Sequence, residues 1–294
     1  MSGPCLVCGE ALVPSRLPGL LRCPGCGFVT ADLELGDEEL ARLYGPDYFH
    51  GEEYADYVAE EASLKDNFRA RLRTLLALVP DAAEKTLFEI GCAYGFFLDE
   101  ARGTFKAVAG IDISEAAVGH ARSALRLDAR QGDYLAHALP GPRDVFCMWD
   151  TIEHLRRPDL VVAKIAREIA PGGVLALTTG DIGSLNARWR GSRWRLIHPP
   201  THLHYFSRRT LERLLQRHGF EVVHVEWPGN VRTLRAILNG LLVVRGLAPE
   251  LYRRLEGWRA LDARISLNLF DIVYVVAWRR PVPSGPIERL PPLG

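Results

Sequence analysis

The sequence predicts an α/β protein: a doubly wound, Rossmann-like sheet of seven mostly parallel strands, preceded by a small N-terminal zinc ribbon. Short apolar runs alternate with amphipathic helical stretches through most of the chain, which is typical of a parallel sheet covered on both faces. A glycine-containing turn follows the first of these runs, in FEIGCAYG, where the end of a strand can bind a ligand. Two C-x-x-C pairs near the N-terminus predict the ribbon.

The bulk composition is that of one large domain with small attachments. The chain has 294 residues, 48% of them hydrophobic, with 36 basic and 36 acidic side chains. The absence of a basic excess argues against a nucleic-acid partner. No apolar run approaches the ~20 residues needed to cross a bilayer, and the N-terminus lacks the features of a secretion signal. We therefore expect a cytoplasmic protein without a transmembrane segment.

The four cysteines Cys5, Cys8, Cys23 and Cys26 form the two C-x-x-C pairs, and each pair is followed by a glycine. The two-residue gap lets both sulfurs of a pair bind one ion, and four soft thiolates suit tetrahedral Zn²⁺. Because sulfur occupies all four positions, none is left for a substrate, so the expected metal is structural. A pair of redox-active motifs is the alternative. We expect residues 1–30 to fold as a ribbon whose stability comes from the metal.

The remaining chain divides by composition. Residues 31–57 are acidic and aromatic and are interpreted as a linker. The main domain is expected at 58–280, interrupted at about 231–266 by a basic, leucine-rich helical insertion. The insertion can pack on the core, form a homodimer contact or associate with a lipid-linked acceptor. The proline-rich tail, 281–294, is expected to be disordered.

Within the main domain, the alternation of patterns predicts each element in turn. Expected strands lie at 86–90, 107–113, a short stretch before Gly132, 144–149, 174–179, 220–227 and 272–278, the last antiparallel. Expected helices lie at 58–79, 96–102, 114–124, 158–170 and 208–218. Ser114 is a good N-cap for the third helix, and the Gly172-Gly173 doublet is expected to end the fourth.

The ends of the first three strands carry residues suited to a ligand. Gly91, Ala93 and Gly95 leave the first turn almost without side chains, so its backbone can approach a ligand closely. Asp112 ends the second strand, where a carboxylate can accept from both hydroxyls of a ribose. Asp133 follows the third strand and can accept from the amino group of a purine. The G-x-A-x-G pattern favours a ligand without the pyrophosphate of NAD.

These motifs resemble those of class I S-adenosylmethionine-dependent methyltransferases. The resemblance is carried by residues 89–95, 110–112, 132–133 and 170–173. It covers roughly residues 58–227 and 272–279. This resemblance implies a protein that transfers methyl groups from S-adenosylmethionine.

The resemblance also implies a role for each motif. The turn from Gly91 to Gly95 would hold the methionine part of S-adenosylmethionine, with Glu89 as an acceptor for its cationic amino end. Asp112 would hold the ribose, and Asp133, with the backbone near Tyr134, would hold adenine. Ala93 stands where the family more often has glycine, and we expect only a local adjustment there.

His154 lies just beyond the fourth strand, in WDTIEHL, on the side where an acceptor should enter. If the acceptor is a hydroxyl, a base that removes its proton adds ~10²- to 10⁴-fold to the rate. We therefore expect O-methylation of a small-molecule or glycan-type acceptor, with His154 as general base. A histidine fixed by its neighbours at a helix end is the structural alternative.

A histidine-rich stretch after the fifth strand, RWRGSRWRLIHPPTHLHYFS, is expected to face the substrate through Trp189, His202 and Tyr205. A metal site or plain packing are the alternatives there. The stretch resembles the corresponding part of sugar-modifying and natural-product methyltransferases.

Three other functions remain open. Asp150, Glu153 and His154 resemble the site proposed to hold a divalent metal in ubiquinone-biosynthesis O-methyltransferases, which implies metal-assisted methylation of a quinone or phenol. The four-cysteine segment and aromatic linker resemble the front of sugar C-methyltransferases, although the large C-terminal domain of those enzymes is not present in this sequence. A non-catalytic module, whose ribbon docks a protein or RNA, is the third.

Overall fold

The structure is a computed structural model that describes residues 3–33, 36, 58, 60–244 and 248–280. The expectations for the tail and for most of the linker therefore lie outside the described residues.

A seven-stranded sheet forms the centre of the main domain. Its strands, in spatial order, are β10 (Phe220–Glu226), β13 (Ile272–Arg279), β8 (Ile169–Gly180), β7 (Arg143–Trp149), β4 (Thr86–Ile90), β5 (Ala107–Asp112) and β6 (Asp128–Gln131). The five strands from β8 to β6 run parallel, and β13 is antiparallel to both of its neighbours. The expected fold class and the antiparallel last strand are confirmed.

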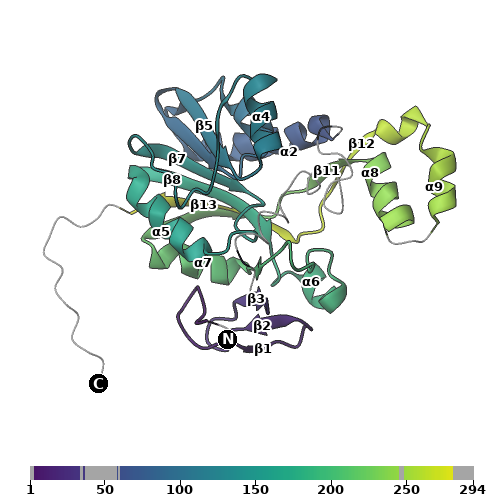
Figure 1. Ribbon diagram of the computed structural model, residues 1–294, viewed down its shortest axis with the longest axis horizontal. Helices are drawn as coiled ribbons and strands as arrows, with labels where there is room; N and C mark the ends of the chain where they lie inside the picture. The colour runs from purple at the N-terminus through teal and green to yellow at the C-terminus, as the bar shows by residue number, and fades with distance from the viewer. Residues whose placement is uncertain (1–2, 34–35, 37–57, 59, 245–247, 281–294) are drawn as a thin grey trace, which may run out of the picture.

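Helices cover both faces of this sheet (Figure 1). One face carries α2 (Glu61–Leu78), α3 (Phe96–Ala101) and α4 (Glu115–Ser123), and the other carries α5 (Pro158–Glu168) and α7 (Arg208–Arg217). Successive residues of a strand point to opposite faces, so Val145 belongs to the first core and Phe146 to the second. A short 3₁₀ turn, η2 (Ala82–Glu84), leads from α2 to β4.

The expected helix ends are confirmed in one place and wrong in another. The Ser114 hydroxyl accepts from the backbone N–H of Ala117, as an N-cap should. The glycine doublet, however, does not end α5. The helix ends at Glu168, and β8 begins at the next residue and contains both glycines. A Cβ at Gly173 would lie 2.8 Å from the backbone oxygen of Asp144, so glycine is required where β8 passes close to β7.

The N-terminal segment, residues 3–33, is called the ribbon below. Its strands β1 (Val13–Pro14), β2 (Leu20–Arg22) and β3 (Val29–Ala31) form an antiparallel sheet whose fourth strand, β9 (His204–Tyr205), belongs to the main domain. Figure 1 shows the ribbon below α7, at the lower edge of the view. The ribbon therefore shares a sheet and a core with the main domain, although the sequence predicted a separate attachment.

Helix α6 (Leu185–Arg190) and the 3₁₀ turn η3 (Gly191–Arg193) connect β8 to β9. The expected insertion is a helical module on a two-stranded stem, β11 (Asn230–Thr233) and β12 (Arg264–Leu267). The module contains α8 (Leu234–Asn239), the π-helical η4 (Gly240–Val244), α9 (Pro249–Leu255) and the 3₁₀ turn η5 (Arg259–Asp262). It projects from the body in Figure 1. Over the described ranges, none of the helices combines the length and apolar character needed to cross a bilayer.

Candidate active site

The turn after β4 combines left-handed backbone with close packing. Gly91, Ala93 and Gly95 have φ values of +76°, +43° and +81°. A Cβ at Gly91 would lie 2.5 Å from the hydroxyl oxygen of Thr151, and a Cβ at Gly95 would lie 2.6 Å from Leu127. The turn is therefore poor in side chains partly because its neighbours leave no room for them. Ala93 adopts a left-handed conformation that glycine favours.

Glu89, on β4, is a buried carboxyl group directly ahead of this turn, only 2% exposed. Burial and then the neighbouring Asp112 raise its pKa well above the usual range, while Arg71 opposes the shift. Its Oε2 atom has no hydrogen-bond partner among the described residues. A buried carboxyl oxygen in this position fits a cationic partner such as an amino-acid ammonium group, which would favour the charged form.

Asp112, at the end of β5, ties two loops together. Its Oδ2 accepts from the backbone N–H of Ala93 at 2.8 Å, and its Oδ1 accepts from that of Ser114 at 2.9 Å. Burial raises the pKa of this half-buried carboxyl, although the backbone donors oppose the shift. Each carboxylate oxygen keeps a second lone pair, so the side chain can still accept from two ribose hydroxyls.

Asp133 and Tyr134 follow β6 and lie in different surroundings. Asp133 is exposed, and its Oδ1 accepts from the backbone N–H of Leu135 at 2.8 Å. The ring of Tyr134 is buried in the core beside Phe88, and its hydroxyl donates to Glu168 at 2.7 Å. The side chain of Tyr134 is thus occupied by packing, which leaves its backbone for the expected contact with adenine.

Asp150, at the end of β7, is engaged by residues other than those expected. Its Oδ2 accepts from the buried guanidinium of Arg71 at 2.9 Å, and its Oδ1 accepts from the hydroxyl of Thr178 at 2.9 Å. The sequence hypothesis placed Asp150 beside Glu153 and His154 as a metal ligand. The structure instead gathers His202 with that pair: each of the three offers a ligand atom within 4.8 Å of the others.

The two histidines of this cluster have the same tautomer. His154 Nδ1 lies 2.8 Å from the carbonyl oxygen of Thr201, and His202 Nδ1 lies 2.9 Å from that of Leu196. A carbonyl can only accept, so each Nδ1 carries the hydrogen and each neutral ring keeps its lone pair on Nε2. Their ring centroids are 4.6 Å apart.

Burial determines the charge of these rings. It lowers the pKa of His154 to about 4, with a further lowering by His198 that the Thr201 carbonyl and Asp150 oppose. Burial and then His154 and His198 lower the pKa of His202 as well. Both rings are therefore neutral near pH 7 and able to accept a proton or bind a metal.

Of the other two residues expected to face a substrate, Trp189 is not part of this cluster, and Tyr205 supports its backbone. Trp189, on α6, is 82% exposed, and the guanidinium of Arg190 lies over its ring. Tyr205 is buried, and its hydroxyl donates to the carbonyl oxygen of His202 at 3.0 Å. The tyrosine thus braces the histidine loop from behind, while the tryptophan offers an open apolar surface.

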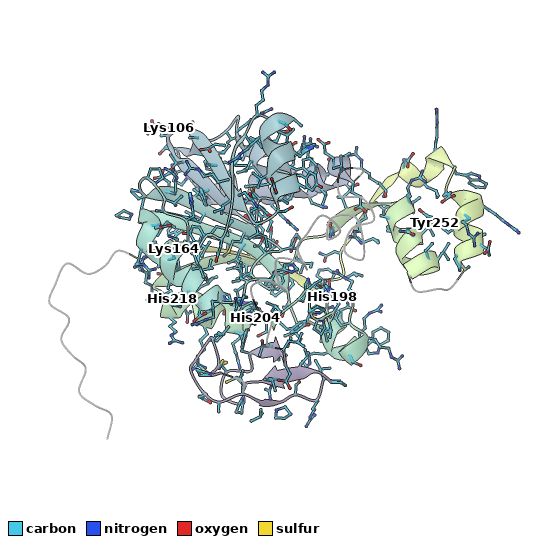
Figure 2. The ribbon with its side chains drawn as sticks, viewed as in Figure 1. Lys106, Lys164, His198, His204, His218 and Tyr252 are labelled. Atoms are coloured by element: carbon cyan, nitrogen blue, oxygen red, sulfur yellow. The ribbon has the colours of Figure 1, made fainter. Side chains whose placement is uncertain are left out.

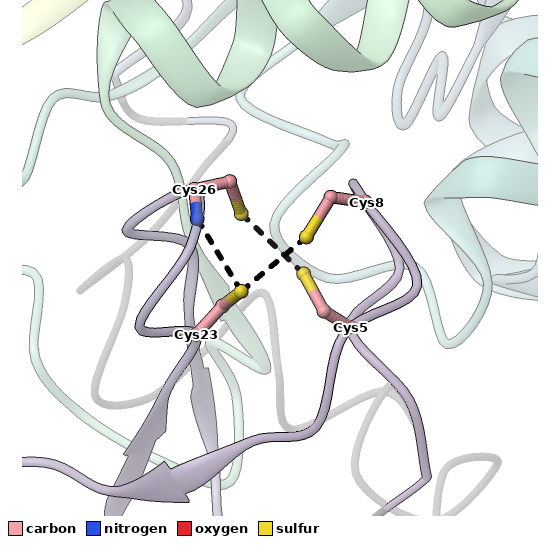
Figure 3. Close-up of side chains that lie close together, drawn as sticks. All are labelled: Cys5, Cys8, Cys23 and Cys26. Carbon is pink, nitrogen blue, oxygen red and sulfur yellow. Dashed lines mark hydrogen bonds between the residues drawn. The ribbon is translucent and has the colours of Figure 1, made fainter. Parts of the chain in front are cut away.

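The four ribbon cysteines converge on one point (Figure 3). The sulfurs of Cys5 and Cys26 are 3.5 Å apart and those of Cys8 and Cys23 are 3.3 Å apart. These separations are far longer than the ~2.05 Å of a disulfide. They are close to the edge of a tetrahedron around one metal, about 3.8 Å for four thiolates. The donor set therefore fits a single tetrahedral ion.

Sequence reasoning missed two buried polar residues that shape this region. Arg71 lies three residues after Phe68 and four before Leu75, on the apolar face of α2, and that position was the available signal. Asp271, 1% exposed, accepts from Trp194 Nε1 at 2.9 Å and from Asn186 and Arg195, which fixes the start of the histidine loop. An aspartate before a strand gives no such signal.

A doubly wound sheet with a side-chain-poor turn after β4 and acidic residues beyond β5 and β6 defines a class I S-adenosylmethionine-dependent methyltransferase. Residues 60–225 match the family described as a methyltransferase domain, more than half of the chain. The chain belongs to that family.

Several curated proteins are similar in sequence. A ubiquinone biosynthesis O-methyltransferase from Thiobacillus denitrificans is 35% identical over 116 residues, 37% of this chain and 50% of that protein. One from Pseudomonas paraeruginosa is 32% identical over 104 residues, 33% of this chain and 45% of that protein. The chain thus spans about half the length of these relatives. One from Nitrosomonas europaea is 28% identical over 216 residues, 71% of this chain and 83% of that protein.

Solved structures share the fold. The YcgJ protein of Bacillus subtilis has a TM-score of 0.52 at 15% identity, covering 73% of this chain and 100% of that one. A Bacillus halodurans protein also has a TM-score of 0.52, at 13% identity, covering 71% of this chain and 99% of that one. At these identities the likeness establishes the fold alone.

Proposed function

We propose that this protein methylates an oxygen of a small-molecule or glycan-type acceptor, with His154 as general base. When bound, S-adenosylmethionine supplies the methyl group on a sulfonium that is already a good leaving group. The protein then has to hold the acceptor in line and take up its proton, and alignment alone can contribute ~7 to 11 kcal/mol.

Residues at the ends of β4, β5 and β6 bind the cofactor in this proposal. The turn from Gly91 to Gly95 lies against its methionine part, and Glu89 accepts from the ammonium group. Asp112 accepts from the ribose hydroxyls. Asp133 and the backbone of Tyr134 bind adenine. The unpartnered Glu89 oxygen and the left-handed turn support this assignment.

One observation carries the role of His154: its Nδ1–H donates to the Thr201 carbonyl, so the lone pair of the neutral ring is on Nε2. The same short turn carries Thr151, which packs against Gly91 of the cofactor loop. His154 thus follows closely in the chain after a side chain that packs against the expected cofactor loop. Its low pKa keeps the ring in the accepting form, although it also makes the ring a weak base.

The test has two stages. Labelled methyl is transferred from the cofactor into a metabolite extract, and mass spectrometry identifies the product. The His154→Ala variant should then lose at least ~100-fold in turnover with unchanged affinity for S-adenosylhomocysteine. The matched control is His224→Ala, which removes a histidine of the edge strand β10. A loss of less than tenfold in His154→Ala would assign the residue to structure.

A second candidate, metal-assisted methylation of a quinone or phenol, is favoured by the grouping of Glu153, His154 and His202. Two imidazole nitrogens and a carboxylate suit a divalent transition metal that binds the acceptor oxygen and lowers its pKa. The names of the similar O-methyltransferases support this class of acceptor. Activity that survives EDTA, with the ribbon metal retained, would exclude this candidate. If this candidate is correct, His202→Ala should lose both the bound metal and the metal-dependent activity.

We also propose that Cys5, Cys8, Cys23 and Cys26 bind one structural Zn²⁺. The convergence of the four sulfurs supports this assignment. Metal analysis of the purified protein should give one tightly held zinc, and the Cys26→Ser variant should lose it. A protein with two disulfides and no zinc would contradict the proposal.

A further inference from the structure

We infer that the ribbon is a working part of the acceptor site: Phe28 and Thr30 are positioning residues that hold the segment 201–204, and through it His154 and His202. The link to an acceptor rests on the proposed function, whereas the mechanical coupling does not. The inference follows from a continuous series of contacts that starts at the cysteines and ends at the two histidines.

The first contacts join the cysteines to Phe28. The backbone N–H of Phe28 lies 3.4 Å from the sulfur of Cys26, and its carbonyl oxygen accepts from the N–H of Cys23 at 2.8 Å. The ring of Phe28 is fully buried, and its centroid lies 5.6 Å from that of the His204 ring and 5.2 Å from that of the Phe206 ring. Figure 2 shows His204 between the sheet and the ribbon. The geometry of the cysteines therefore sets where this ring meets the main domain.

The next contacts join β3 to the main domain. The carbonyl oxygen of Leu203 accepts from the backbone N–H of Ala31 at 2.8 Å and from the hydroxyl of Thr30 at 3.0 Å. Because that hydroxyl has given its hydrogen to Leu203, it accepts from Nδ1 of His204, 3.0 Å away. Thr30 thus makes two side-chain hydrogen bonds across the boundary, and both are partly buried.

The last contacts join this segment to the two site histidines. The backbone N–H groups of Leu203 and His204 donate to the carbonyl oxygen of Glu153 at 2.9 and 3.1 Å. His154 Nδ1 donates to the Thr201 carbonyl. A displacement of Leu203 therefore moves both sides of the cluster, because the Glu153 turn and the His202 loop are bonded to the same segment.

The cofactor cradle depends on different contacts. Gly91 and Cys92 donate to the carbonyl oxygen of Ile111, and Ala93 donates to Asp112. These bonds connect the turn after β4 to β5, and they involve neither the ribbon nor residues 201–204. Loosening of the ribbon should therefore affect the acceptor side and spare the cofactor side.

The test is hydrogen exchange on the full chain, with three variants of matched design. Thr30→Val keeps the shape of the side chain and removes both hydrogen bonds, Thr30→Ser restores them, and Ser15→Ala removes a ribbon hydroxyl that bonds only within the ribbon. Thr30→Val should exchange at least about fivefold faster in peptides covering 152–156 and 200–206, because each of the two lost hydrogen bonds contributes roughly a factor of five. Peptides covering 86–95 should not change, and neither should affinity for S-adenosylhomocysteine.

Cys26→Ser is a fourth variant, which removes the expected ribbon metal. It should raise exchange in the ribbon and in the same two segments, with the cofactor cradle unchanged. Faster exchange confined to residues 3–33, or spread equally over the sheet, would overturn the inference. Thr30→Val exchanging like wild type would overturn it too. If exchange changes as expected but wild type transfers no methyl group, the coupling stands and the proposed function fails.

Discussion

At Gly91 two independent constraints require glycine. The backbone has φ of +76°, and a Cβ would lie 2.5 Å from Thr151. Thr151 in turn lies on the turn that carries His154. Glycine at this position therefore sets how closely the turn after β7 approaches the turn after β4.

We predict that Gly91→Ala lowers the free energy of unfolding by more than ~1 kcal/mol, since a left-handed alanine alone costs about that much and the clash adds to it. Affinity for S-adenosylhomocysteine should fall as well. Gly119→Ala is the matched control, because Gly119 lies inside α4 with open space around it, so this change should stabilise by ~0.5–1 kcal/mol. Urea unfolding measures the stability of the two variants, and calorimetry measures their affinity for S-adenosylhomocysteine. Equal stability of the two variants would contradict this account.

The half-buried His154 predicts part of the response to acid. Burial lowers the pKa of His154 to about 4, whereas the unfolded chain binds the proton near pH 6.5. Between these values the unfolded state binds more protons, so stability is complete above pH 6.5 and declines as the pH falls toward 4. His154 should contribute on the order of 2 kcal/mol to the loss between pH 7 and pH 5.

Urea unfolding at the two pH values checks this. The His154→Gln variant cannot titrate and should lose less stability on acidification than wild type. An identical pH dependence in His154→Gln would show that the ring is not held neutral by the fold.

Single residues were predictable where their position in the chain determines their place in the sheet. Asp112 and Asp133 follow from strand ends, and both lie there. The partner of Asp150 did not follow, because Arg71 reaches it from a helix 79 positions away. Pairings of this kind depend on how helices pack, which spacing along the chain does not show.

Among the elements, the main strands and helices of the seven-stranded sheet were predictable, and the strand expected at 86–90 has the same bounds as β4. Strand β9 was not, since two residues carry no period and the strand exists only because β3 pairs with it. The stem of the insertion could not be predicted either, because β11 and β12 are short and are separated by the helical module.

The module should be removable as a unit. Thr233 pairs with Arg264 in the stem, and the buried Asn67 of α2 bonds the stem at Asn230 and Val231. We predict that replacing residues 234–263 with Asn-Gly closes a tight hairpin and leaves the sheet intact. The melting temperature of the main domain and the affinity for S-adenosylhomocysteine should stay close to wild type. Loss of cofactor binding in this variant would show that the module contributes to the site.

The proposed function divides the whole molecule into two sides. In this proposal the ends of β4, β5 and β6 form the cofactor side, and the ribbon, β9 and the turn after β7 form the acceptor side. The two sides meet where Thr151 packs against Gly91. On the proposed coupling, we expect the ribbon to influence the acceptor without altering how the cofactor is held.

A crystal structure of the protein with S-adenosylhomocysteine tests the central claim most directly. We predict that the ligand lies along the turn from Gly91 to Gly95, with its ammonium group at Glu89 and its ribose hydroxyls at Asp112. The claim would be contradicted by a ligand bound elsewhere, or by a cradle filled with protein side chains in a crystal grown at saturating ligand.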